Sequence, residues 1–144
     1  MKFYILFLSI IFIFVSSSCT CEVQEVSGPS SYSSSYVSRI GIKKYKFNIT
    51  SQLMENSQEW IFGQKLPLEM EDAVAIAEKE ILYYDNSKEL WLLSDIELSR
   101  FGETNKWFYV IKFHKKQKEN MSDLISDDYL MIPVLFNKQA IKGE

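Results

Sequence analysis

Residues 67–87, PLEMEDAVAIAEKEILYYDNS, carry the best helix pattern of the chain. Apolar residues recur in it at spacings of three and four, which is the period of an amphipathic helix. The acidic residues Glu69, Glu71 and Asp72 stand in the expected first turn, where they favour the helix dipole. The sequence therefore predicts a helix over residues 69–84. Its apolar stripe consists of Met70, Ala73, Val74, Ala77, Ile81 and Tyr84.

Segments that alternate apolar and polar residues lie on both sides of this helix and predict strands. We expect strands at 42–50, 90–98, 107–114, 129–136 and, briefly, 139–141. The first of them reads as an edge strand. Trp60, Ile61 and Phe62 are expected to enter the core from a loop. A helix followed by strands joined by turns indicates an α+β fold, with one main helix packed on a three- to five-stranded antiparallel sheet meander.

The same alternation assigns the two faces of the sheet. The helix is expected to cover Leu92, Ile96, Tyr109 and Ile111. The opposite, open face is expected to carry Asp95, Glu97 and Lys112. A turn through Gly102 then sets Asp95 or Glu97 across from Lys112.

The N-terminus has the composition of an export signal. Lys2 precedes an apolar run at residues 3–15, and three serines follow it. The run is shorter than the ~20 apolar residues that span a bilayer. Cys19, directly after the serines, resembles the acylated cysteine of a bacterial lipoprotein signal, and this implies lipidation of Cys19 after removal of residues 1–18. Cleavage after Ser18 without lipid and an uncleaved anchor are the alternatives.

A serine-rich segment separates this signal from the rest of the chain. Seven of the twelve residues at 27–38 are serine. A segment with so little to bury predicts a flexible tether over residues 19–41. The remaining residues, 42–144, are expected to form a single α+β domain.

Composition limits the chemistry that this chain can support. Lys and Arg number 16 and Asp and Glu 19, so the net charge of −3 argues against nucleic acid as a partner. One His and two Cys leave few ligands for a transition metal. His114 follows a strand and is expected at an exposed strand end rather than as a general base. We therefore assign no catalytic, cofactor-binding or metal-binding residue.

The polar segment 115–127 is expected to be a long hairpin loop, and two clusters of charged residues lie in it or directly after it. Asp123, Asp127 and Asp128 are interpreted as a solvated acidic turn, with a hard cation such as Ca²⁺ as the alternative. Lys115, Lys116 and Lys118 are interpreted as a solvated loop tip, with a contact to anionic lipid or surface polymer as the alternative.

Three segments carry a family resemblance. Residues 67–77, PLEMEDAVAIA, residues 106–110, KWFYV, and residues 132–141, IPVLFNKQAI, resemble the small exported PepSY-like, cystatin-like domains of bacteria. That group includes inhibitory propeptide segments, and the resemblance carries over no catalytic residues. A second resemblance is to small immunity proteins that combine a helix with a curved sheet.

These observations favour a non-enzymatic function. The first hypothesis is an exported protein of the bacterial envelope, anchored by lipid on Cys19, that binds or inhibits a protein partner through the open face or an edge strand. The alternative is an immunity-type or structural envelope lipoprotein. An enzyme is disfavoured, and secretion without an anchor stays open.

Overall fold

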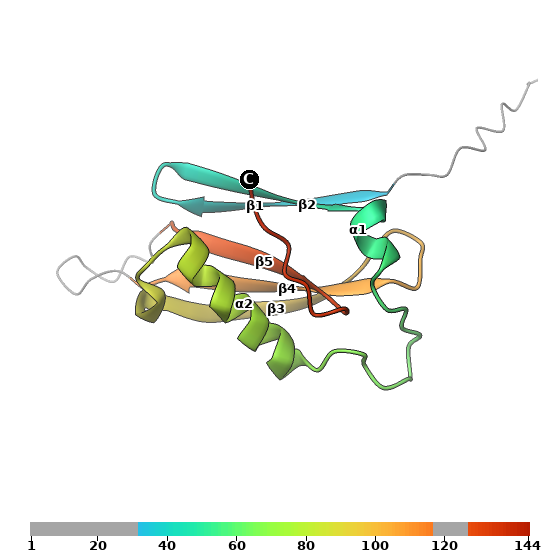
Figure 1. The fold of residues 1–144 in the computed structure, drawn as a ribbon. Coiled ribbons are helices and arrows are strands. Elements are labelled where there is room, and N and C mark those ends of the chain that lie inside the picture. The colour runs from blue at the N-terminus through green and yellow to red at the C-terminus, as the bar shows by residue number, and fades with distance from the viewer. Residues whose placement is uncertain (1–31, 117–126) are drawn as a thin grey trace, which may run out of the picture.

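The computed structural model describes residues 32–116 and 127–144. It shows an α+β fold, as predicted, with a five-stranded antiparallel sheet in the order β2-β1-β5-β4-β3 and one main helix, α2 (Figure 1). The elements are β1 (Ser33–Ile40), β2 (Lys43–Thr50), α1 (Ser51–Glu55), α2 (Met70–Tyr84), a 3-10 turn (Lys88–Leu90), β3 (Trp91–Arg100), β4 (Trp107–Lys115) and β5 (Tyr129–Leu135).

Strand β1 corrects the prediction of a tether over residues 19–41. It pairs with β2 along its whole length, from Ser33 opposite Thr50 to Ile40 opposite Lys43. Composition suggested a flexible segment because serine has little to bury. The backbone of β1 is nevertheless satisfied by β2, which composition does not reveal. The domain therefore begins before residue 42, while Cys19 and the first part of the tether lie outside the described residues.

On the side of β5 that faces away from β4, three different partners pair with its backbone. One ladder pair, Arg39 opposite Tyr129, joins β5 to β1. At the next position a side chain takes the place of a backbone hydrogen bond: the hydroxyl of the buried Ser38 accepts the Met131 N–H at 2.7 Å. Beyond this point the C-terminal segment takes over, and Ile141 donates its N–H to the Pro133 oxygen at 2.9 Å. The short strand expected at 139–141 is reduced to one bridge, Val134 opposite Ala140.

Helix α2 covers one face of the sheet, which we call the helix face, and packs on β4 and β5 (Figure 1). Ala73, Ala77 and Ile81 are its buried residues, as the stripe predicted. Met70 is instead exposed at the first turn. The two alanines allow close approach to the sheet, and the Tyr109 hydroxyl donates to the Leu68 oxygen at 3.2 Å.

The register of β3 against β4 confirms part of the face assignment. Asp95 lies opposite Lys112, and Asp95 and Glu97 are exposed on the face opposite α2, which we call the open face. Tyr109 and Ile111 are buried on the helix face, as predicted.

Leu92 was assigned to the wrong face. The β3–β4 register shifts between Leu93 and Asp95, where Ser94 forms a β-bulge. One extra residue reverses the alternation on one side of the bulge. Leu92 therefore lies on the open face, 54% exposed, whereas Trp91 is buried.

The loop after α1 was only partly predicted. Trp60 is buried, and its ring lies edge-on to that of Trp107 with the ring centroids 5.3 Å apart. Its indole N–H donates to the backbone oxygen of Gln64 at 2.9 Å. Ile61 and Phe62 are exposed instead of buried, Phe62 by 89%. The turn that the Trp60 hydrogen bond closes leaves both of these side chains outside the core.

Candidate functional site

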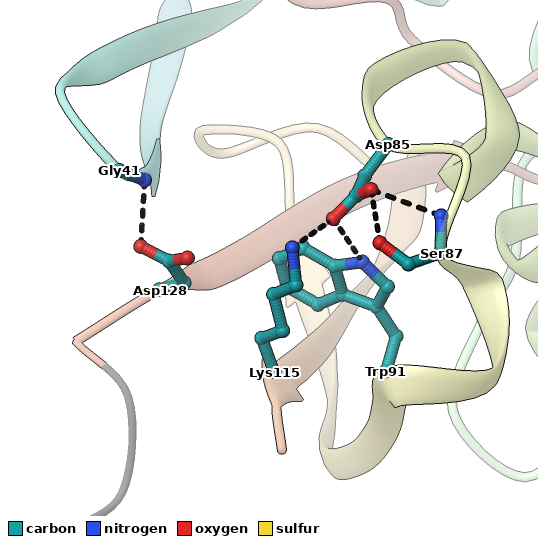
Figure 2. Close-up of polar contacts among 6 residues, drawn as sticks. All are labelled: Gly41, Asp85, Ser87, Trp91, Lys115 and Asp128. Atoms are coloured by element: carbon teal, nitrogen blue, oxygen red, sulfur yellow. Dashed lines mark hydrogen bonds and ion pairs between the residues drawn. The ribbon is translucent and has the colours of Figure 1, made fainter. Parts of the chain in front are cut away.

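A polar cluster surrounds Asp85, the C-cap of α2 (Figure 2). Its Oδ1 accepts the Ser87 backbone N–H at 2.9 Å and the Ser87 hydroxyl. Its Oδ2 accepts the Trp91 indole N–H at 3.1 Å and pairs with the Lys115 ammonium. The cluster thus ties the end of α2 to the start of β3 and the end of β4.

These contacts control the ionisation of Asp85. Burial by itself would raise the pKa of the carboxyl group. The hydrogen bonds from Lys115, from the Ser87 hydroxyl and N–H, and from Trp91 outweigh burial and hold the pKa of Asp85 well below its ordinary value. The carboxylate is therefore charged and fully occupied, which suits a structural clamp rather than an acid or base.

Lys115 was predicted in a solvated loop tip, and the structure corrects this. Its side chain is only 22% exposed and lies against both Asp85 and the Trp91 ring, 5.7 Å from the ring centroid. Lys116 is exposed, as expected, and Lys118 lies outside the described residues. Neither the distance in sequence between Asp85 and Lys115 nor their flanking residues signalled this pair.

Asp128 of the expected acidic turn is tied to a hairpin. Asp128 accepts the Gly41 backbone N–H at 2.6 Å, which fastens the start of β5 to the β1–β2 turn (Figure 2). Asp127 is exposed, and Asp123 lies outside the described residues. Within residues 32–116 and 127–144, no three Asp, Glu, His or Cys side chains gather as a possible metal site.

His114 is half-buried rather than at an exposed strand end. It lies in β4 between Leu92 and Tyr129, and its ring is 6.4 Å from that of Tyr129. Its Nδ1 is buried and has no hydrogen-bond partner among the described residues. Because Nδ1 accepts or donates no hydrogen bond among the described residues, no described carboxylate orients the His114 ring through that atom, as a general base would require.

The free edge of the sheet is strand β3. It is the last strand in the order, and no segment of the described chain pairs with its outer side. Phe101 donates its N–H to the Lys106 oxygen at 2.9 Å. Because bonded pairs alternate along an antiparallel ladder, the peptide groups of Leu98 and Ile96 point outward from the sheet.

The β3 edge exposes apolar side chains on the helix face and acidic side chains on the open face. Leu93 is 44% exposed on the helix face, next to the half-buried Ile96 and Leu98. On the open face, Asp95 accepts the Ile96 N–H at 2.9 Å and Glu97 accepts the Ser99 hydroxyl. No described ion pair uses either carboxylate.

The other outermost strand, β2, is partly closed. Lys46 and Glu144 exchange backbone hydrogen bonds of 2.9 and 3.1 Å on its outer side. A shallow groove of about 410 Å³ lies beside this pair, and Lys142 of the C-terminal segment contributes to its lining. Its charges carry both signs, so the groove selects no class of ligand.

Comparison of the chain with protein-family models, curated proteins and solved structures gave no match. The resemblance to PepSY-like, cystatin-like domains therefore stays a prediction. In the part of the chain that the structure describes, no helix has both the length and the apolar character to cross a bilayer.

Proposed function

We propose that this protein is an exported, lipid-anchored protein of the bacterial envelope that binds or inhibits a protein partner and catalyses no reaction. The export signal at residues 1–18 and the position of Cys19 support the anchor. Stable anchoring needs more than one acyl chain, and bacterial lipoproteins, which this signal resembles, carry three.

The observation that carries the binding function is the free edge of β3. An edge strand presents outward-pointing peptide groups, and binding modules use such edges to add a strand from a partner. At β3 the Ile96 N–H is bonded to Asp95, so a partner strand would pair with the Leu98 peptide groups and displace the Asp95 contact. Leu92 and Leu93 add exposed apolar surface on both faces beside that edge. The chemical groups support the same view, because Asp85 and Lys115 neutralise each other and the Nδ1 of His114 has no hydrogen-bond partner among the described residues.

The anchor is tested by intact mass of the protein purified from its native host. We expect a chain that begins at Cys19 and carries the mass of its acyl groups. An unmodified chain, or one that retains Met1, would contradict the anchor.

The binding function is tested by photo-crosslinking in native envelopes. A crosslinking amino acid replaces Leu93 beside the free edge, and a second variant carries it at Lys79, an exposed position of α2. We expect one discrete crosslinked protein from position 93 and none from position 79. Absence of a discrete product from position 93 would count against a binding module.

A further inference from the structure

We infer that β3 accepts an extended segment of a partner protein in which basic and apolar residues alternate. This inference rests on the proposed binding function and adds the site and the chemistry of the partner. It starts from the two faces of the edge. A strand added to β3 continues the sheet, so its successive side chains fall alternately on the helix face and the open face.

The open face of the edge is acidic. Asp95 and Glu97 are exposed there, two residues apart. Among the described residues, Asp95 accepts a hydrogen bond from the Ile96 N–H and Glu97 accepts one from the Ser99 hydroxyl. Lys112 lies opposite Asp95 on β4, but its ammonium turns towards β5 and lies 5.8 Å from the Tyr129 ring centroid. Two carboxylates at this spacing, neither in an ion pair with a described residue, favour basic residues at alternate positions of an incoming strand.

The helix face of the same edge is apolar. Leu93 is exposed, and Ile96 and Leu98 are half-buried because α2 packs on β4 and β5. The intervening positions of the incoming strand would contact these side chains. Apolar residues at those positions would complete the apolar strip beside α2.

A second copy of this chain fits the edge poorly. Two β3 strands paired antiparallel would bring four carboxylates onto one face, and the bulge at Ser94 interrupts the edge. Charged side chains and bulges are devices that oppose pairing between identical edges. The same acidic pair that excludes a second copy selects a basic partner.

The test uses a synthetic peptide, acetyl-Gly-Lys-Val-Lys-Val-Lys-Val-Gly-amide, titrated into the isotope-labelled protein by NMR. We expect saturable shifts along β3 and slower hydrogen exchange of the Leu98 amide, whose N–H points outward. The peptide with Glu in place of Lys should leave the spectrum unchanged. The double variant Asp95→Lys/Glu97→Lys should weaken binding at least about tenfold.

Glu55→Lys controls for positive charge added away from β3, because Glu55 is exposed on α1. It should bind the peptide within about twofold of the original protein. Equal weakening by both changes, shifts centred on another element, or no binding would overturn the inference. So would a β3–β3 dimer in sedimentation. The crosslink from position 93 is scored separately, so a failed peptide titration does not decide the proposed function.

Discussion

The clamp at Asp85 should contribute about 3 kcal/mol to the free energy of unfolding, so Asp85→Ala should remove about that amount. The side chains of Asp85 and Lys115 are only 13% and 22% exposed. Removing one member of a buried ion pair costs ~3–5 kcal/mol because its partner is left charged and unpaired. The lower end of that range applies, since Lys115 keeps some contact with water.

Urea unfolding at pH 7 measures this loss, and the chain supplies its own control. Glu78 and Lys88 form a second ion pair of 3.5 Å, but their side chains are 45% and 41% exposed. Glu78→Ala should therefore cost less than about 1 kcal/mol. In a double-mutant cycle, Asp85→Ala and Lys115→Met should show a coupling energy of ~0.5–3 kcal/mol.

The pH dependence supplies a second test of the clamp. Because the folded protein holds the pKa of Asp85 below its ordinary value of 3.8, the unfolded chain binds the proton more readily. The stabilisation is therefore complete above that ordinary value and is lost as the pH falls through it towards the lower folded pKa. The difference between the original protein and Asp85→Ala should shrink in that window. A loss no greater than that of Glu78→Ala, or one independent of pH, would refute the clamp.

Three further predictions concern the fold. Ile111→Ala should cost ~2–5 kcal/mol by emptying a core position, whereas Lys112→Ala on the open face should cost less than about 1 kcal/mol; urea unfolding decides, and the reverse order would invert the faces. A chain of residues 41–144 lacks β1 and should melt without cooperativity in calorimetry, so a sharp transition would show that β1 is dispensable. Gly102→Ala should lower stability by at least about 1 kcal/mol, because Gly102 has φ +56° and a Cβ there would lie 2.7 Å from the Tyr32 ring; an unchanged melting temperature would contradict this.

The candidate site was predictable in part from sequence. Alternation alone placed Asp95 and Glu97 on the open face, and the structure confirms both. It did not reveal that β3 is the free edge, because strand order depends on which segments meet in space. It also missed the Asp85–Lys115 pair, whose members are brought together by the return of β4 past the end of α2.

Elements whose signals are local could be predicted from the residues alone. The helix follows from apolar spacing and acidic residues in its first turn, and β2, β4 and β5 follow from alternating or continuous apolar residues. Tertiary structure alone decided three features. Strand β1 forms because β2 satisfies its backbone, although its own residues bury little. Leu92 faces away from α2 because the bulge at Ser94 shifts the register of β3 against β4 by one residue. Asp85 is charged although only partly exposed, because Lys115, distant in sequence, lies beside it. Such non-local pairings leave no periodic trace in a single chain.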